Sequence, residues 1–316
     1  MDTKIKFSVV IPLYNKQTYI KDTLYSVLNQ TFTNFEVIVV DDGSKDDSLE
    51  TARSVSDSRI TVISQENAGV SVARNTGIYA ARGEFIAFLD ADDYWDECYL
   101  ETISELTEMY PESDIFVTAY RVLMNRDKIN YSRQKSPESG CIDSYWLTLD
   151  GGYDFVWTSA TVIRRETLIS AGCFKKGEKI GQDLDMWARV ARINPRVAYS
   201  SKICVSYNRM ADQNARNRVK IAHASAFIQD LEEEMANPVR SDAEIKAIQR
   251  KYDLKMTVYI FTAILAGEKK LAKRELKKWK GIKNYKNIML RMGLRIALCS
   301  PTFLNRWIYG IRLKIF

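Results

Sequence analysis

The first half of the chain alternates short apolar runs with segments whose apolar residues recur at helical spacing. The apolar runs predict β-strands at Phe7 to Leu13, Glu36 to Val40, Arg59 to Ser64 and Glu84 to Leu89. The intervening segments predict helices at Lys16 to Gln30, Asp46 to Ser54 and Gly69 to Arg82. Because parallel strands need crossovers of this kind, the pattern predicts an α/β fold with a doubly wound, mostly parallel sheet.

Polar residues follow the predicted strands at the points where ligands bind to such sheets, outside the carboxyl ends of the strands. These residues are Pro12, Tyr14 and Asn15 after the first strand, Asp41 and Asp42 after the second, and Asp90, Ala91, Asp92 and Asp93 after the fourth. An aromatic ring such as Tyr14 stacks on a flat base, and a carboxylate such as Asp41 accepts hydrogen bonds from a base or a ribose. The set favours a nucleotide site, with ordinary turns and helix caps as the alternative.

The carboxylates from Asp90 to Asp93 repel one another and lose solvation on burial. Such a cluster is solvated, caps a helix or holds a hard divalent metal. No G-x-G-x-x-G follows the first strand, so the phosphates of a nucleotide need another positive charge. A metal on Asp90 and Asp92 would supply it, with Arg74 as a second cation. The alternative for Arg74 is a solvated helix face, and Asp93 is expected to cap the next helix.

From Asp114 onward the regular alternation stops. A strand with the sequence DIFVTAYRV is followed by a polar stretch, 125–140, that predicts a flexible loop. Aromatic residues then gather around Gly151 and Gly152, where they form either a platform for the apolar face of a sugar or part of the core. These aromatic residues are Trp146, Tyr153, Phe155 and Trp157.

An amphipathic helix further along carries Asp183 and Asp185 in its first turn. Carboxylates at that position are favoured by the helix dipole, and one of them is also a candidate general base. The only histidine, His223, lies in a later predicted helix, so base chemistry in this chain falls to a carboxylate.

The charge is distributed unevenly along the chain of 316 residues, whose net charge is +6. The part from Lys255 to the end contains 15 Lys and Arg and only two acidic residues, Glu268 and Glu275, whereas the preceding part has a net charge of −7. A basic, aromatic-bearing helical region at 268–316 favours an anionic membrane surface, with a solvated helical bundle as the alternative. No nucleic-acid recognition motif accompanies the charge.

Five scattered cysteines indicate free thiols, and no apolar run reaches the length of a spanning helix. No secretory signal is evident at the amino terminus. We therefore expect a cytoplasmic protein, with peripheral attachment to the inner face of the plasma membrane through 268–316.

Six segments in order resemble the family 2 glycosyltransferases, which are inverting, nucleotide-sugar-dependent enzymes with the GT-A fold. They cover about residues 5–210 and are VVIPLYNKQTYI, VIVVDDGSKDDS, NAGVSVARNTG, FIAFLDADD, WTSATVIRRETL and GQDLDMWAR. The resemblance implies a catalytic domain at 1–215, divided into a nucleotide-sugar-binding part at 1–113 and an acceptor-binding part at 114–215. A helical, basic region at 216–316 would follow.

The resemblance also implies a role for individual residues. Those matching Pro12, Tyr14, Asn15 and Asp41 hold the uracil and ribose, and Arg74 lies near the donor. The D-x-D element Asp90-Ala91-Asp92 contacts the ribose and, chiefly through Asp92, a Mn or Mg ion on the diphosphate. Asp183 is the implied catalytic base. The implied reaction moves a sugar, from a UDP-linked donor, to a hydroxyl of a glycan or lipid-linked acceptor in cell-surface polysaccharide synthesis.

Two departures from the family pattern bear on this implied function. Gln182 stands where many members have Glu. Many members also have a basic or histidine-containing loop that closes on the diphosphate, and the corresponding segment here, VSYNRMADQNARN, lacks it. Arg209 and Gln213 are the candidates to substitute for that loop. A non-catalytic nucleotide-sugar binder and a sugar nucleotidyltransferase therefore stay open as alternatives.

Overall fold

The computed structural model describes residues 5–124, 127–131, 138–150, 156–211, 224–279 and 292–298. The chain divides into two compact units. The first comprises Met1–Thr148, Asp154–Glu178 and Gln182–Asp212, and the second comprises Leu149–Tyr153, Lys179–Gly181 and Gln213–Phe316. A domain boundary at 215, with an inner boundary at 113, stays a prediction.

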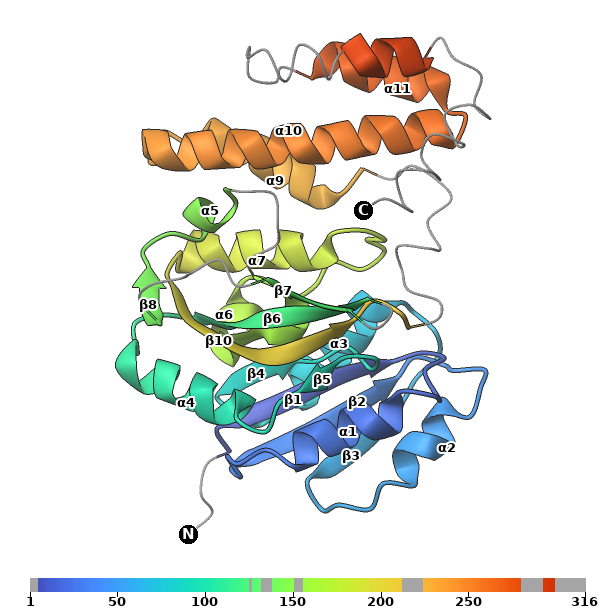
Figure 1. Ribbon diagram of the computed structural model, residues 1–316, viewed down its shortest axis with the longest axis vertical. Helices are drawn as coiled ribbons and strands as arrows, with labels where there is room; N and C mark the ends of the chain where they lie inside the picture. The colour runs from blue at the N-terminus through green and yellow to red at the C-terminus, as the bar shows by residue number, and fades with distance from the viewer. Residues whose placement is uncertain are drawn as a thin grey trace. The chain divides into compact units, whose positions relative to one another are not determined.

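The first unit begins with the predicted alternation of parallel strands and helices (Figure 1). Its strands are β1 (Phe7–Leu13), β2 (Phe35–Asp41), β3 (Ile60–Ser64) and β4 (Phe85–Phe88), and the helices between them are α1 (Ile20–Leu28), α2 (Ser48–Arg53) and α3 (Val70–Ala80). The strands lie in the order β3-β2-β1-β4 and pair in parallel. The predicted α/β fold is confirmed.

The sheet continues beyond β4 with mixed strand directions. The further strands are β5 (Tyr94–Trp95), β6 (Ile115–Met124), β7 (Asp127–Tyr131), β8 (Ser139–Ile142), β9 (Thr161–Arg164) and β10 (Val197–Asn208). The helices among them are α4 (Tyr99–Met109), α5 (Tyr145–Thr148), the 3-10 helix η1 (Thr158–Ala160), α6 (Arg165–Ser170) and α7 (Gln182–Ile193). Strand β9 runs antiparallel to both β4 and β6, whereas β10 is parallel to β6. The expectation of a loop throughout 125–140 is wrong, because β7 pairs with β6 and β8 begins at Ser139.

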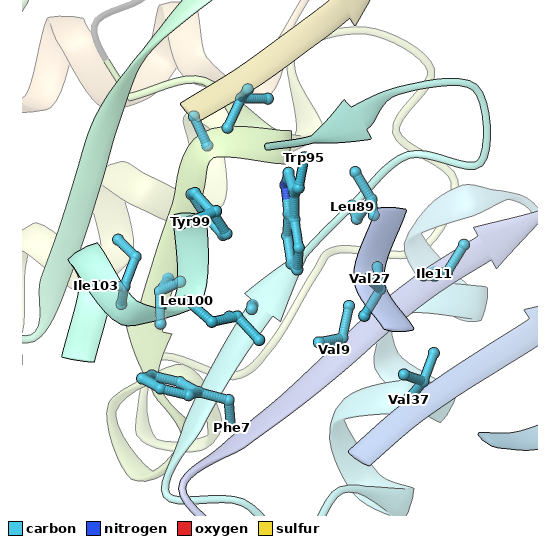
Figure 2. Close-up of a cluster of buried hydrophobic side chains, with 14 of the residues drawn as sticks. Phe7, Val9, Ile11, Val27, Val37, Leu89, Trp95, Tyr99, Leu100 and Ile103 are labelled. Atoms are coloured by element: carbon cyan, nitrogen blue, oxygen red, sulfur yellow. The ribbon is translucent and has the colours of Figure 1, made fainter. Parts of the chain in front are cut away.

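The core explains why these segments form the elements they do. Strands β1 and β2 carry nearly continuous apolar runs because both of their faces are buried, whereas the edge strand β3 is only partly buried. Helix α1 buries Ile20, Leu24 and Val27, which share one face at helical spacing. Figure 2 shows Trp95 and Tyr99 within the same cluster, and their ring centroids are 4.2 Å apart.

The strand register brings several chain segments to one edge of the sheet. Leu13 pairs with Asp41 and Val10 pairs with Phe88, so the carboxyl ends of β1, β2 and β4 lie together. Because β9 is antiparallel to β4, its amino-terminal end, preceded by η1, lies at the same edge. The carboxyl end of β10 also reaches this edge, since β10 is parallel to β6 and β6 is antiparallel to β9.

Gly77 of α3 packs directly against Val10 of β1. A Cβ atom there would overlap Cγ1 of Val10 and lie 3.1 Å from its Cγ2. Alanine favours a helix by about 1 kcal/mol over glycine, but overpacking a core costs about 1–3 kcal/mol. We expect Gly77→Ala to lower the free energy of unfolding, as measured by urea denaturation, despite its better helix propensity.

Gly293 provides the matched control for this prediction, because a Cβ atom there meets nothing within 4 Å. Gly293→Ala should leave the free energy of unfolding unchanged or raise it. Combining Gly77→Ala with Val10→Ala should recover part of the loss, since the smaller side chain removes the overlap. Equal stability of Gly77→Ala and the wild type would contradict the packing account.

The second unit is helical, with α9 (Ala226–Met235), α10 (Asp242–Leu265) and α11 (Lys269–Lys278). The predicted break at Asn237-Pro238 is confirmed, because α9 ends before it and α10 begins after it. Ser241 and Glu244 form a capping box at the start of α10. The indole of Trp279 donates a hydrogen bond of 2.8 Å to Asp253 of α10.

The expectation of free thiols is confirmed for the cysteines that the structure describes. Cys98, Cys141, Cys173 and Cys204 are free thiols. None of the helices that the structure describes combines the length and the apolar character needed to cross a membrane. His223, Gln213 and Cys299 lie outside the described residues.

Candidate active site

The loop after β1 is fastened to the loop after β2 by hydrogen bonds that involve the chain backbone. Asn15 adopts a left-handed conformation with φ of 52°. Its N–H donates to Ser44 Oγ at 3.1 Å, and its Oδ1 accepts from the N–H of Lys45 at 2.8 Å. The N–H of Lys16 donates to Ser48 Oγ at 2.7 Å. These bonds hold the Pro12 to Asn15 segment beside the end of β2, with Pro12, Tyr14 and Asn15 partly exposed and Leu13 buried.

Asp41 and Asp42 have different environments although they are neighbours. The carboxylate of Asp42 accepts hydrogen bonds of 2.8–2.9 Å from Gln65 Nε2 and from the N–H groups of Ala68 and Gly69. It therefore orders the loop that leads into α3. From the described residues, Asp41 receives two longer bonds, both 3.3 Å, donated by the N–H of Ser44 and by Ser64 Oγ. Its carboxylate keeps acceptor capacity, and we retain Asp41 as the nucleotide-contact candidate of the pair.

The D-x-D turn after β4 holds two carboxylates, each paired with a cation. Arg74 of α3 donates to Asp90 Oδ1 at 2.8 Å, and its guanidinium lies 5.3 Å from the centre of the Phe174 ring. Because the Arg74 side chain is only 6% exposed, the alternative of a solvated helix face is wrong. Lys16 Nζ lies 2.6 Å from Asp92 Oδ2. Burial raises the pKa of Asp92 above its ordinary value, although the charge of Lys16 acts in the opposite direction.

Asp93 and Ala91 are buried and form hydrogen bonds within the protein. Asp93 is fully buried, and its carboxyl group accepts hydrogen bonds from Ser159 Oγ at 2.5 Å and from the N–H of Asn208 at 2.9 Å. The expectation that Asp93 caps the following helix is wrong, since α4 begins only at Tyr99. Burial and the nearby charges of Asp92 and Asp90 raise the pKa of Asp93 well above its ordinary value. Ala91 contributes its carbonyl, which accepts a bond from Thr23 Oγ1.

Two consecutive residues of η1 connect the acidic turn with helix α7. Ser159 Oγ donates to Asp93 and accepts a bond of 3.2 Å from the N–H of Asp90. Thr158 Oγ1 donates to Asp183 Oδ2 at 3.1 Å. The candidate base and the D-x-D turn are thereby held next to each other by adjacent side chains.

The two carboxylates at the start of α7 have separate tasks. Asp185 is 0% exposed and forms ion pairs with Lys175 at 2.6 Å and with Arg189 at 2.7 Å. It therefore anchors α7 to the preceding loop. Asp183 is partly exposed, and its Oδ1 accepts a bond of 2.9 Å from the N–H of Leu184. Of the two candidates for a general base, Asp183 is the one placed to reach a substrate.

The aromatic residues expected near this region separate into two groups. Trp146 is fully buried and belongs to the core, whereas Tyr153 and Phe155 lie outside the described residues. Trp157 is partly exposed and directly precedes Thr158. Its indole stacks on Tyr120 of β6 at 5.7 Å and contacts Tyr207 of β10 at 4.4 Å between ring centroids.

The donor chemistry of the acidic turn fits a hard divalent ion shared with a substrate. Carboxylate oxygens of Asp90 and Asp92 are the type of ligand that Mg²⁺ and Mn²⁺ take. Within the described ranges, no group of three or more acidic, histidine or cysteine side chains forms a cage that could hold a metal by itself. Mg²⁺ typically binds through one or two carboxylates together with substrate phosphates, so a two-carboxylate turn suits a metal that arrives with a diphosphate.

Lys16, Thr158 and Ser159 are the site residues that the sequence reasoning missed. Lys16 lies inside the segment VVIPLYNKQTYI, directly after Asn15, so its position next to a predicted anion site was a usable signal. Thr158 and Ser159 offered no comparable signal, because their partners lie 25 and 66 positions away in sequence.

Comparisons with solved structures define the class of fold. The crystal structure of S. aureus TarS in complex with UDP-GlcNAc is 20% identical with a TM-score of 0.64, and the match covers 85% of this chain and 88% of that one. The mannosyltransferase PcManGT from Pyrobaculum calidifontis, in complex with GDP-Man and Mn²⁺, is 16% identical with a TM-score of 0.58, covering 99% and 87%. The chain therefore has the GT-A fold.

Comparisons of sequence define the family. The pattern of Glycosyl transferase family 2 matches residues 8–170. The chain is 39% identical over 226 residues to TuaG of Bacillus subtilis, named as a teichuronic acid biosynthesis glycosyltransferase, covering 70% of this chain and 86% of TuaG. It is 44% identical over 115 residues to EpsH of B. subtilis, covering 36% of this chain. The chain belongs to glycosyl transferase family 2.

The aligned segments cover only part of other relatives. The match spans 33% of EpsH and 17% of the glycosyltransferase GlyA of Streptococcus pneumoniae, which is 42% identical over 117 residues. These shorter matches leave most of both relatives unaligned.

Proposed function

We propose that the protein transfers a sugar from a nucleotide sugar, linked to UDP, to a hydroxyl of a glycan or lipid-linked acceptor with inversion at the anomeric carbon. The observation that carries this proposal is the pair Thr158 and Ser159. Their hydroxyls hold Asp183 and the turn containing Asp90 and Asp92 side by side. A base and a diphosphate-binding turn at this proximity are what an acceptor hydroxyl and a departing nucleotide require.

Each residue then has a chemical task. Tyr14 would stack on the base, Asn15 would fix the loop that carries Tyr14, and Asp41 would accept hydrogen bonds from the uracil or ribose. Arg74 orients Asp90 toward the ribose. A divalent ion held by Asp92 with Asp90 would neutralise the charge that develops on the departing diphosphate.

Asp183 would accept the proton of the acceptor hydroxyl on the face of the sugar opposite the diphosphate. Thr158 donates to Oδ2 of Asp183 and the N–H of Leu184 donates to Oδ1, and the partly exposed carboxylate keeps further acceptor capacity for a substrate hydroxyl. Attack from that face inverts the anomeric carbon. Gln182 cannot act as a base, and Asp185 is buried in two ion pairs, so within this turn the proton would go to Asp183.

The names of similar proteins support a place in polysaccharide synthesis. TuaG is named for teichuronic acid biosynthesis, and TarS binds UDP-GlcNAc. We propose an acceptor of the same general class for this chain, a glycan of the cell surface or its lipid-linked precursor. PcManGT binds GDP-Man instead, so the base of the donor is part of what must be tested.

Incubation of the purified protein with a panel of nucleotide sugars and MnCl₂ tests the proposal. We expect slow release of UDP from one UDP-sugar and no release after chelation with EDTA. Release of pyrophosphate would instead indicate a nucleotidyltransferase. Binding of UDP and Mn²⁺ with neither hydrolysis nor transfer would indicate a non-catalytic binder.

We further propose that the basic end of the chain attaches to anionic membrane from the cytoplasmic side. In α11 the cationic side chains are Lys269, Lys270, Lys273, Arg274, Lys277 and Lys278, whereas Ala272 and Leu276 are buried. Each basic residue near an anionic surface contributes about 1 kcal/mol to binding.

Lys270, Lys273 and Lys277 changed together to Gln should weaken binding to phosphatidylglycerol vesicles about 100-fold at low salt. Equal cosedimentation of this variant and the wild type would contradict the proposal.

A further inference from the structure

Among the described residues, Lys16 is the cation paired with Asp92, the proposed metal ligand. Its Nζ lies 2.6 Å from Asp92 Oδ2, and the side chains of the two residues are 13% and 14% exposed. Its backbone is fixed by the bond to Ser48 Oγ, and Nζ also lies 5.7 Å from the centre of the Tyr19 ring. The pair is therefore an enclosed, charge-assisted contact, unlike a solvated surface salt bridge.

The charges around the turn explain why a lysine is held there. Asp90, Asp92 and Asp93 follow one another within four residues, and their charges repel when water is excluded. Arg74 is paired with Asp90, so Lys16 supplies the positive charge at Asp92. A divalent ion on Oδ2 of Asp92 would have to displace this ammonium group, and one on Oδ1 would share the same carboxylate with it at short range. Two cations cannot occupy Oδ2 together without strong repulsion.

We propose that Lys16 is the resident cation of Asp92 in the metal-free protein, and that it competes with the divalent metal so that metal binds well only together with the nucleotide. The inference rests on the proposed function, because it takes Asp92 as the metal ligand. When a diphosphate is present, the displaced ammonium gains an anionic partner in place of the carboxylate. Metal alone supplies no anion to the displaced ammonium.

Calorimetric titration of MnCl₂ into the protein, with and without UDP, tests this competition. Lys16→Met keeps the length of the side chain and removes the charge. We expect its affinity for Mn²⁺ alone to rise about tenfold over the wild type, the scale of one partly buried charge-assisted bond. With UDP bound, the affinity for Mn²⁺ should change by less than about threefold. UDP would then strengthen Mn²⁺ binding about tenfold less in the variant than in the wild type.

Two further variants separate the competition from a general effect of charge. Lys16→Arg keeps a cation at the position and should retain the wild-type difference between the two titrations. Lys21→Met removes an exposed positive charge from α1 and should behave as the wild type. Mn²⁺ binding by Lys16→Met that equals or falls below the wild-type value without UDP overturns the proposal. Failure of the wild type to bind Mn²⁺ even with UDP would instead refute the metal site of the proposed function.

The displacement of Lys16 by Mn²⁺ can also be tested on the wild-type protein alone. Acetylation of amines with an N-hydroxysuccinimide ester, followed by peptide mass spectrometry, reports how accessible each lysine is. Lys16 should react slowly in the metal-free protein and faster when Mn²⁺ is added at saturating concentration, because displacement frees its ammonium. Lys21 should react equally in both conditions. No change at Lys16 on Mn²⁺ saturation overturns the competition even if the variants fold poorly.

Discussion

Replacing Asp183 with Asn should lower the rate of sugar transfer by about 10² to 10⁴, the usual contribution of a positioned general base. The amide of Asn cannot accept the proton of the acceptor hydroxyl. Its size is nearly that of Asp, and its oxygen can still accept the bond from the N–H of Leu184. Thermal unfolding, UDP binding and Mn²⁺ binding should therefore match the wild type, so that the loss appears only in the transfer rate.

Asp185 provides the matched control two residues further along α7. It is fully buried and paired with both Lys175 and Arg189, so Asp185→Asn leaves two cations with a weakened partner. That variant should lose stability in thermal unfolding, whereas Asp183→Asn should not. Transfer by purified Asp183→Asn protein at close to the wild-type rate would remove Asp183 from the role of base.

The arrangement of β1 to β4 could be predicted because local patterns determine it. Each strand is a short apolar run bounded by polar residues, and each connecting segment has helical spacing, so the parallel sheet follows from crossovers of the right length. The second half offered weaker patterns. Strand β7 has the sequence DKINY, which lacks an apolar run, and it is a strand because it pairs with β6. Tertiary pairing of that kind leaves no local signature.

The candidate site shows the same division between local and long-range information. Asp41, Asp90 and Asp92 were identifiable because they follow strands whose carboxyl ends meet at one edge. What each carboxyl group contacts could not be read from spacing. Asp92 and Asp93 are adjacent, yet the first is paired with Lys16 and the second is buried against Ser159. Their partners lie 76 and 66 positions away in sequence, so only the fold shows which partner each carboxyl group has.

Replacing Asp92 with Asn should abolish metal-dependent transfer, with a loss of at least about 10², because the leaving diphosphate loses the charge that stabilises it. The neutral amide is a poor ligand for a hard divalent ion, so calorimetry should detect little Mn²⁺ binding in the presence of UDP. Asp90→Asn should lose less, since Asp92 remains and the amide oxygen of the substituted side chain can still accept the bond from Arg74. Both variants should remain folded.

A loss of transfer in Asp92→Asn has a second explanation, because this substitution also leaves the ammonium of Lys16 without its carboxylate partner. The double variant Lys16→Met with Asp92→Asn separates the two explanations. If Asp92 acts by binding the metal, the double variant stays as inactive as Asp92→Asn and binds no more Mn²⁺. If the stranded ammonium were the cause, removing it would restore transfer. Restoration in the double variant would therefore show that Asp92 serves mainly to neutralise Lys16.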